Sequence, residues 1–384
     1  MQYRINEKNG DRISALAFGC MRFDRDDAAT ERQILTAIDG GVNYFDTAYV
    51  YPRSEERLGR ILAANKRREA VFLADKLPPY LVKNIADAEK ILTAQLKRLQ
   101  TERIDYYLIH MLAGAGEWER LGALGLPDWL ARRQKAGVLG NIGFSYHGGL
   151  PEFRPLLDVH DWDFCMLQYN YFDEHSQAGR DGVKAAAGRG LPLMIMEPLR
   201  GGKLAAPPPA ARAVWENAVP ARSPAEWGLR WVWNHPEVLT VLSGMNSEAM
   251  VRENVRAVED AGPDSLGPAE LALYAEARRL LAAATKVPCT GCNYCMPCPH
   301  DVDIPLCFST YNDLALQPRS LTLFAYIFRL HTHEASLCRR CGHCTPRCPQ
   351  GIDIPTQLGE VARRLERFPY RPARALIKRF MRLR

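Results

Sequence analysis

The fold is decided by three neighbouring stretches, NYFDTAYVY (43–51), AVFLADK (70–76) and IDYYLIH (104–110). Each begins as a short apolar run rich in aromatic and β-branched residues, and each carries a polar side chain where the run ends. Helix-like segments at 54–65 and 84–99 separate them. Strands that alternate with helices predict parallel strands joined by right-handed crossovers.

The same alternation continues on both sides of this region, up to about residue 262. Further strand-like runs occupy 15–19, 138–145, 164–170, 192–197 and 239–244, and further helix-like segments occupy 28–39, 178–188 and 248–259. Eight strands, each followed by a helix, predict an α/β fold of the (β/α)8 or TIM barrel type. A doubly wound open sheet is the competing architecture, but it requires a Gly-rich phosphate loop after the first strand. That turn reads AFGCMRF (17–23) and contains no GxGxxG motif, which favours the barrel.

Composition places the chain among soluble globular proteins. Of 384 residues, 47% are hydrophobic and 24% are charged, as in ordinary globular domains. No apolar run approaches the ~20 residues of a membrane helix, so we expect no membrane span. The first residues, MQYRINEKNGDR, lack the features of a signal peptide. We therefore expect a cytoplasmic protein.

The net charge of +6 is concentrated at the C-terminal end. Residues 359–384 contain nine Lys or Arg and two Glu, which gives this tail +7. A basic tail attracts acidic partners, although a solvated amphipathic helix would have the same composition.

Polar residues follow three consecutive predicted strands. They are Asp46, with Tyr49 and Tyr51 after it, Lys76 and His110. Strand ends of a barrel meet at one face, so these side chains are predicted to share a pocket. A Tyr hydroxyl can protonate a carbonyl oxygen if a nearby ammonium lowers its pKa. A carboxylate can hold that ammonium and a His can orient the carbonyl, so the set indicates carbonyl reduction.

This pattern resembles the aldo/keto reductase family over most of residues 1–262. The resemblance assigns Asp46, Tyr51, Lys76 and His110 to the family's catalytic tetrad, with Tyr51 favoured over Tyr49 by the D-T-A-x-x-Y spacing. GVLGNIGFS (137–145), LQYN (167–170), EPLRGGKL (197–204) and SEAMVRENV (247–255) match further family motifs.

The resemblance also implies a nicotinamide cofactor, NADP or NAD. The cofactor-binding residues that it implies are Ser145, Gln168, Leu199, Gly201, Gly202, Lys203, Ser243, Gly244, Glu253 and Asn254. The loop LSGMNSEAMV (242–251) departs from the family because it carries no Arg or Lys for the 2′-phosphate of NADP. Met196 replaces a Tyr that often stacks on nicotinamide, and Tyr146 replaces an Asn.

Nine of the eleven cysteines lie between Cys289 and Cys348. Two runs, C-x2-C-x2-C-x2-C-P and C-x2-C-x2-C-x3-C-P, contain Cys289, Cys292, Cys295, Cys298, Cys338, Cys341, Cys344 and Cys348. The second run has the spacing of bacterial ferredoxins and the first is one residue shorter. Clustered thiols in a reducing cytosol usually bind metal, and this spacing favours iron–sulfur clusters over structural zinc.

Two [4Fe–4S] clusters account for eight cysteines, with a single cluster as the alternative. In two-cluster ferredoxins the fourth ligand comes from the other run. The crossed assignment therefore groups Cys289, Cys292 and Cys295 with Cys348, and Cys338, Cys341 and Cys344 with Cys298. Cys20, Cys165 and Cys307 are interpreted as small buried residues. The interior of this module, about 306–335, is predicted to be helical, and the C-terminal extension resembles a ferredoxin-containing subgroup of aldo/keto reductases.

The sequence predicts three parts: a barrel at 1–285, an iron–sulfur domain of the ferredoxin type at 286–358 and a basic tail at 359–384. The first hypothesis is an oxidoreductase of a carbonyl or sugar-like substrate whose clusters exchange electrons with an acidic partner, a ferredoxin or flavodoxin. The second is an electron-transfer or redox-sensing protein that uses the barrel as a nucleotide platform. In the third, the clusters are structural. No nucleic-acid partner is expected.

Overall fold

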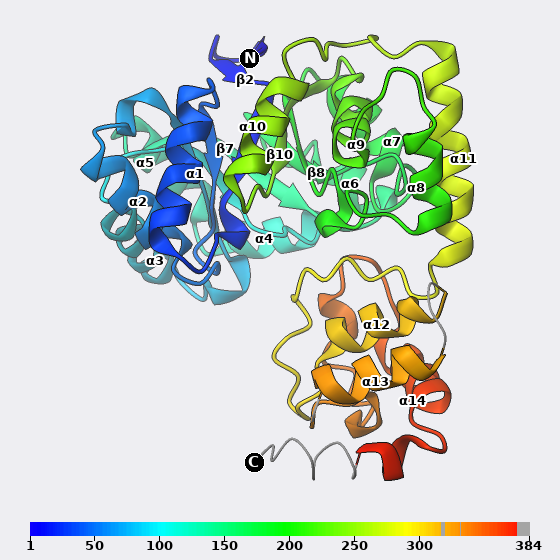
Figure 1. Cartoon of the computed structure of the whole chain (residues 1–384). Coiled ribbons are helices and arrows are strands. Elements are labelled where there is room, and N and C mark those ends of the chain that lie inside the picture. The colour runs from blue at the N-terminus through cyan, green and yellow to red at the C-terminus, as the bar shows by residue number, and fades with distance from the viewer. Residues whose placement is uncertain (316–318, 331, 375–384) are drawn as a thin grey trace. The chain divides into compact units, whose positions relative to one another are not determined.

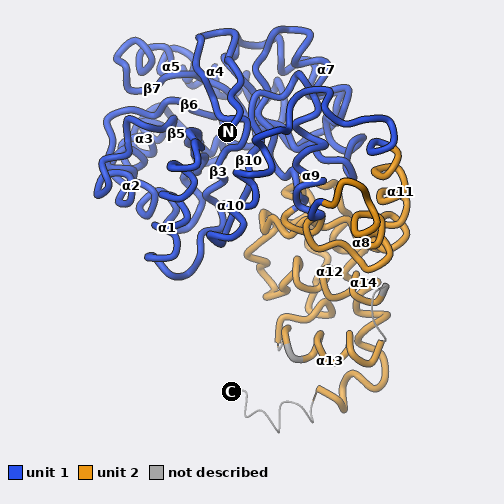
Figure 2. The backbone as a smooth tube through the Cα atoms, turned by 45° about the horizontal axis from the view of Figure 1, so that its top comes forward, with its two compact units in different colours: residues 1–200, 222–271 blue, residues 201–221, 272–384 orange. Residues whose placement is uncertain are grey.

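A computed structural model describes residues 1–315, 319–330 and 332–374. The chain forms two compact units, which Figure 2 colours separately. The first contains residues 1–200 and 222–271, and the second contains residues 201–221 and 272–384. The predicted boundaries at 285/286 and 358/359 do not coincide with this division, and helix α14 (Ile354–Leu365) runs through the second of them.

The first unit contains a closed barrel of eight parallel strands, in the order β10-β3-β4-β5-β6-β7-β8-β9 (Figure 1). The strands are β3 (Leu16–Gly19), β4 (Tyr44–Asp46), β5 (Phe72–Leu77), β6 (Ile104–Ile109), β7 (Leu139–Tyr146), β8 (Phe164–Gln168), β9 (Leu193–Met196) and β10 (Val238–Ser243). The barrel closes where Val241 of β10 pairs with Leu16 of β3. The predicted TIM barrel is confirmed, with a strand in each of the eight predicted runs.

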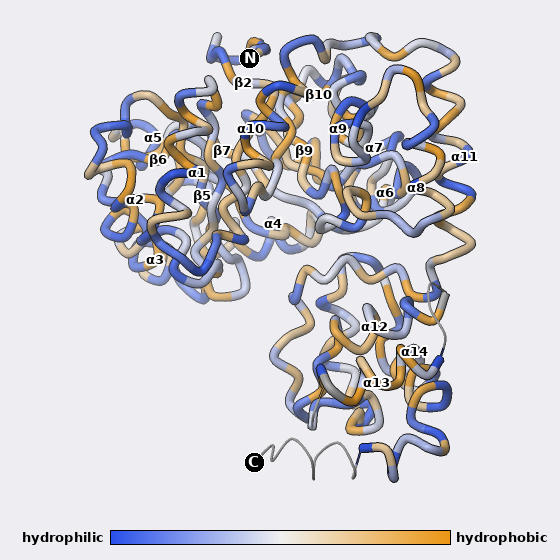
Figure 3. The backbone as a smooth tube through the Cα atoms, viewed as in Figure 1, coloured by the Kyte–Doolittle hydropathy of each residue, from blue (hydrophilic) through white to orange (hydrophobic). Residues whose placement is uncertain are grey.

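Amphipathic helices surround the barrel, and Figure 3 shows that each mixes hydrophilic and hydrophobic residues. They are α1 (Asp27–Asp39), α2 (Ser54–Ala64), α3 (Ile85–Leu99), α4 (Ala115–Ala123), α5 (Leu126–Lys135), α6 (Leu150–Leu156), α7 (Gly179–Ala187), α9 (Pro224–Trp233) and α10 (Glu248–Ala257). Helix α2, for example, buries Leu58, Ile61 and Leu62. These spacings of three and four residues keep one helical face towards the strands.

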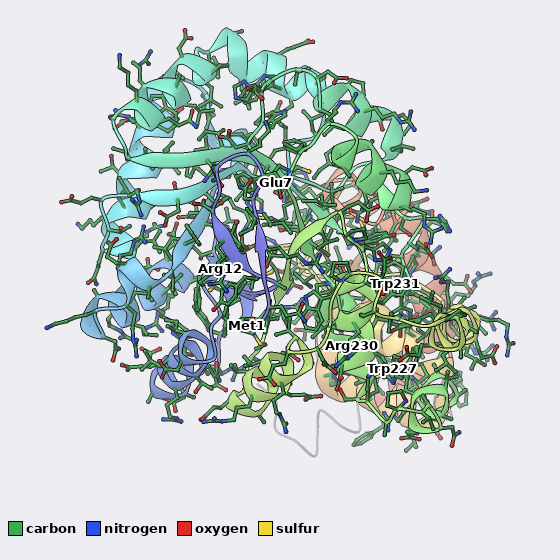
Figure 4. The ribbon with its side chains drawn as sticks, turned by 90° about the horizontal axis from the view of Figure 1, so that it is seen from above. Met1, Glu7, Arg12, Trp227, Arg230 and Trp231 are labelled. Carbon is green, nitrogen blue, oxygen red and sulfur yellow. The ribbon has the colours of Figure 1, made fainter. Side chains whose placement is uncertain are left out.

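The barrel interior is filled by large side chains from different strands. The Tyr44 and Tyr106 rings lie 5.2 Å apart, and the Tyr106 and Phe164 rings lie 5.1 Å apart. A hairpin that the sequence did not predict, β1 (Tyr3–Ile5) with β2 (Arg12–Ser14), precedes the barrel. Its turn donates a hydrogen bond from Asn6 to the Tyr106 hydroxyl, which in turn donates one to Asp11 at 2.6 Å. Figure 4 shows Glu7 at the tip of this hairpin.

The second unit is mainly helical. Its helices are α8 (Pro209–Glu216), α11 (Pro268–Ala284), α12 (Ile304–Asn312), α13 (Arg319–Leu330) and α14. Short 3-10 turns complete both units: Cys20–Arg22, Arg68–Ala70, Pro79–Leu81, Arg200–Gly202, Asp313–Ala315, Ala335–Leu337 and Thr345–Arg347. Trp215 of α8 packs on Tyr274 of α11, with ring centroids 5.1 Å apart. Among the described residues, no helix is long and apolar enough to cross a membrane.

The segments DVDIP (301–305) and GIDIP (351–355), one after each cysteine run, start a helix in the same way. The side chain of Asp303 accepts a hydrogen bond from the backbone N–H of Leu306 at the start of α12. The side chain of Asp353 accepts the equivalent bond from Thr356 at the start of α14. Both aspartates are N-caps, which satisfy backbone donors that a helix start leaves open. Cys307, on α12, is fully buried, as predicted.

Candidate active site and cluster sites

The strand ends of β4 and β5 bring a buried ion pair together. The Lys76 ammonium donates hydrogen bonds to Asp46 Oδ2 and to the carbonyl oxygen of Thr47, each at 2.6 Å. Lys76 is 2% exposed and Asp46 is 4% exposed. If either side chain moved away, the other would remain as an uncompensated buried charge, which is strongly destabilising. Each side chain therefore fixes the position of the other.

Tyr51 and His110 lie beside this pair. The Lys76 ammonium stands 4.9 Å from the centroid of the Tyr51 ring. The His110 ring meets the Tyr51 ring edge-on, with centroids 6.0 Å apart. The four residues predicted as a tetrad are therefore neighbours. Tyr49 is placed differently, because its ring is covered by the Arg98 guanidinium of α3 at 4.7 Å.

Burial sets the protonation preferences of this pocket. It raises the pKa of Asp46, against the opposing effect of Lys76. It also lowers the pKa of His110 well below its usual range, and the charge of Lys76 lowers it further. His110 is consequently a neutral imidazole that can donate a hydrogen bond without being an acid.

A second histidine reaches the same pocket and was not predicted from the sequence. His147 directly follows β7, and its electrostatic interaction with His110 contributes to the lowered pKa of His110. Burial lowers the pKa of His147 to about 4, although a hydrogen bond with Gln177 opposes the shift. Its neighbour Tyr146, predicted to replace the family Asn, donates a hydrogen bond to the Gly149 carbonyl at 2.7 Å. The available sequence signal was a titratable side chain directly after a barrel strand.

Several predicted cofactor residues are held in a buried polar network. Gln168 donates a hydrogen bond to Asp173 at 3.2 Å and accepts one from Gln177. Asp173 also pairs with the buried Arg200 guanidinium at 2.9 Å. Ser145 accepts a hydrogen bond from the backbone N–H of Met111 at 2.8 Å. The Asp173–Arg200 pair was missed because its members lie 27 residues apart, and only Arg200 falls within a predicted motif, EPLRGGKL (197–204).

The remaining cofactor predictions divide into two places. In the first unit, Asn254 donates a hydrogen bond to Ser243 at 3.0 Å, and Ser223 contacts Glu253. Gly244 lies at the end of β10, and Leu199 lies against Gly228 of α9. Gly201, Gly202 and Lys203 belong to the second unit. All ten cofactor assignments stay predictions.

Lys203 makes an unexpected contact inside the second unit. Its ammonium donates a hydrogen bond to the carbonyl oxygen of Cys289, the first cysteine of the first run. The two preceding glycines have positive φ angles of 66° at Gly201 and 93° at Gly202, which favour glycine. A loop predicted to bind the nucleotide and a segment predicted to bind a cluster are thus directly linked.

The eight cysteines of the two runs line two separate cavities. Cys289, Cys292, Cys295 and Cys348 line one of about 310 Å³, and Cys298, Cys338, Cys341 and Cys344 line the other, of about 290 Å³. Each set combines three thiols of one run with the last thiol of the other run. This is the crossed grouping that the sequence predicted, and the roles of the single thiols as ligands stay predictions.

The backbone of the two runs follows the same path. The N–H of Gly291 donates to Cys289 Sγ at 3.4 Å, and the N–H of Arg340 donates to Cys338 Sγ at 3.4 Å. Gly291 and Arg340 both have positive φ, 72° and 54°. Such N–H···S contacts favour thiolate over thiol and tune cluster potentials. Two sets of four soft thiol ligands with this support fit two [4Fe–4S] clusters.

Comparison with known families agrees with these observations. The model of the aldo/keto reductase family matches residues 15–263. The chain belongs to the aldo/keto reductase family. It is an oxidoreductase, and its residues 288–352 match the model of a 4Fe–4S dicluster domain. Iron–sulfur clusters are therefore part of this reductase, as the cysteine spacing predicted.

The reductase is similar to several known proteins. The oxidoreductase YrpG of Bacillus subtilis is 25% identical, over 67% of this chain and 91% of that protein. The 6-dehydroglucose reductase of Novosphingobium aromaticivorans is 26% identical, over 65% and 88%. Among solved structures, AKR11C1 of Bacillus halodurans in its holo form has a TM-score of 0.61 with 24% identity, over 72% and 96%. A Klebsiella pneumoniae aldo-keto reductase in complex with NADPH has a TM-score of 0.58 with 21% identity, over 73% and 94%.

Proposed function

We propose that this reductase interconverts a small carbonyl compound and its alcohol by using NADP or NAD, and that its two clusters exchange electrons with an acidic partner protein. The observation that carries the first part is the position of the Lys76 ammonium, 2.6 Å from Asp46 and 4.9 Å from the Tyr51 ring. The similarity to a 6-dehydroglucose reductase supports a sugar-like substrate.

Each member of the tetrad has a separate role in the proposal. The Tyr51 hydroxyl gives its proton to the carbonyl oxygen during reduction and takes it back during oxidation. The Lys76 ammonium stabilises the phenolate that forms, and Asp46 holds the ammonium in place. Neutral His110 donates a hydrogen bond to the same carbonyl oxygen, where negative charge develops.

The cofactors supply the redox chemistry, since a nicotinamide transfers a hydride, which is two electrons, and each cluster carries one. In this proposal Gln168 and Ser145 hold the nicotinamide end, and Glu253 with Asn254 holds the adenine end, as the family resemblance implies. The choice between NADP and NAD stays open, because the segment GMNSEAM (244–250) brings no Arg or Lys. The NADPH complex of the Klebsiella neighbour favours NADP.

The test of the tetrad is the substitution Tyr51→Phe, compared with Tyr49→Phe. Both changes remove one phenol hydroxyl, but only Tyr51 lies beside Lys76. We expect Tyr51→Phe to lower kcat for carbonyl reduction by about 100-fold or more, and Tyr49→Phe to change it by less than about threefold. Nicotinamide binding, followed by fluorescence quenching, should be unchanged in both. Equal activity in the two variants would overturn the proposal and would favour a redox-sensing role for the barrel.

The link between the two cofactors is tested without a partner. NADPH or NADH is added anaerobically, and the cluster absorbance near ~400 nm is followed together with the EPR signal. Bleaching is expected because the two clusters together can take the two electrons of one hydride, one each, with its proton released to solvent. Lys203 links the predicted nucleotide loop to the first cysteine run. An unchanged spectrum in protein with full iron content would separate the barrel from the clusters. Thiols stay reduced in the cytosol, so the proposal includes a cytoplasmic location.

A further inference from the structure

The two cysteine runs differ in exposure and in charge. Cys341 of the second run is exposed, whereas Cys289 of the first run is 9% exposed. Residues 287–300, which contain the first run, include no Asp, Glu, Lys or Arg. The segment Cys338–Cys348, which we call the arginine loop, contains three arginines in eleven residues. Cys341 is the one exposed thiol among the eight, so the second cysteine run reaches the surface within a basic segment, whereas the first run carries no charged residue of its own.

The arginines of this loop point their charge outward. Arg339, Arg340 and Arg347 are all exposed. Within the described part of the chain, Arg339 and Arg347 form no ion pair, while the Arg340 guanidinium donates to the hydroxyl of Thr356 at 3.2 Å. Residues 335–352 include no Asp or Glu. Asp353, directly after this range, interacts electrostatically with Arg340, so the uncompensated positive charge of the arginine loop is that of Arg339 and Arg347.

We propose that the arginine loop is the docking surface for an acidic one-electron carrier protein. The inference rests on the proposed exchange of electrons with a partner, and it specifies the surface. Electron transfer between proteins weakens steeply with distance, so a carrier must approach the exposed edge at Cys341. Complementary charge steers a partner to that edge and fixes its orientation.

The basic C-terminal segment is the competing surface. In its described part, Arg363 and Arg364 on α14 are exposed, but both form ion pairs with Glu360. The rest of the predicted docking tail, 375–384, lies outside the described residues. Nucleic acid is a further ligand of basic surfaces, but single strands bind through aromatic side chains as well, and the arginine loop contains no Phe, Tyr or Trp.

The experiment measures the affinity of the full-length protein, with its clusters, for a purified acidic flavodoxin. Isothermal titration at about 50 mM and about 200 mM salt is compared for three double variants. Arg339→Gln with Arg347→Gln changes the arginine loop, Arg363→Gln with Arg364→Gln changes α14, and Arg132→Gln with Lys135→Gln changes exposed residues of α5. Each variant loses two positive charges. Iron content and the visible spectrum verify that the clusters are intact.

We expect the arginine-loop variant to weaken binding about tenfold at low salt and less at high salt, because screening shortens the reach of the charges. The other two variants should change affinity by less than about twofold. Equal weakening by the α14 variant would overturn the assignment, and so would absence of saturable binding to the unmodified protein. Tighter binding of a 20-base DNA strand to the same surface would also overturn it.

These outcomes are independent of the barrel chemistry. The arginine-loop variant should keep the carbonyl reductase activity with NADPH or NADH, since that reaction needs no carrier. If Tyr51→Phe remains fully active while flavodoxin still binds the loop, the proposed function fails and the docking surface stands. If the reductase activity is normal but flavodoxin does not bind, only the docking inference fails.

Discussion

Replacing Lys76 with Met leaves a buried carboxylate without its cation. The ammonium of Lys76 lies 2.6 Å from Asp46 Oδ2, a separation at which two charges attract by roughly 6 kcal/mol at an effective dielectric constant of ~20. Desolvation of both groups offsets much of this attraction. Breaking such a pair by removing one partner costs about 3–5 kcal/mol, because the remaining charge stays buried. We expect Lys76→Met to lower the free energy of unfolding by that amount.

The assay is urea denaturation at neutral pH, followed by circular dichroism. Lys90→Met is the matched control, since Lys90 is exposed on α3 and surface substitutions usually change stability by less than about 0.5 kcal/mol. The double variant Asp46→Asn with Lys76→Met removes both charges and should recover most of the loss. Lys76→Met would be inactive as a reductase, so stability is the informative measurement.

The stability lost in Lys76→Met should depend on pH. Burial already raises the pKa of Asp46, and Lys76 is the charge that lowers it. Without Lys76 the pKa rises further, so ionised Asp46 destabilises the folded protein above that pKa, and protonation relieves the penalty as the pH falls. The gap in stability between the single and double variants should therefore shrink on acidification. Equal stability of Lys76→Met and Lys90→Met at neutral pH would refute the reasoning.

Three further outcomes follow from the structure. Gly59→Ala should cost about 1–3 kcal/mol in urea denaturation because its Cβ would lie 2.4 Å from the α3 backbone, whereas Gly122→Ala has open space. Cys348→Ala should lower iron content from about eight to about four per chain, and Cys307→Ala should retain it. Burial lowers the pKa of His147 to about 4, so the free energy of unfolding of the native protein should fall by up to about 3 kcal/mol between pH 6.5 and about 4 on account of this group. His147→Gln should lack this contribution to the acid sensitivity, as urea denaturation at the two pH values would show.

The barrel could be predicted because each strand is buried on both faces and is therefore a short, continuous apolar run. The run 70–76 became β5 and the run 104–110 became β6, within two residues at each end. The hairpin β1–β2 was missed because its strands, YRI (3–5) and RIS (12–14), carry an Arg each and form no continuous apolar run. Its pairing depends on contacts with Tyr106, about one hundred positions away. The hydrophobic pattern of a short sequence segment cannot indicate a contact with a residue so far away in the chain.

The proximity of the four tetrad residues could be predicted for a related reason. Parallel strands place their ends at one face, so a polar residue at each end is enough to locate Asp46, Lys76 and His110. His147 was not identified because the predicted run 138–145 ended one residue short of β7, so that Tyr146 stood directly after the predicted strand in place of His147. Tyr146, the residue before it, is directed to Gly149 instead. Strand register can be inferred from a sequence pattern, but the direction of a loop residue cannot.

The division of the chain also decides how the role of the clusters can be tested. Truncation near residue 285 would be the simplest test of whether the clusters are only structural. It would, however, remove Cys289, whose carbonyl oxygen accepts a hydrogen bond from Lys203. Residues 201–221 pack with the C-terminal unit, so a truncated barrel would lose support for its own predicted nucleotide loop. Inactivity after truncation would not distinguish lost electron transfer from a displaced loop. Cys348→Ala keeps the chain and the Lys203 contact, so its effect on activity reports on the cluster itself.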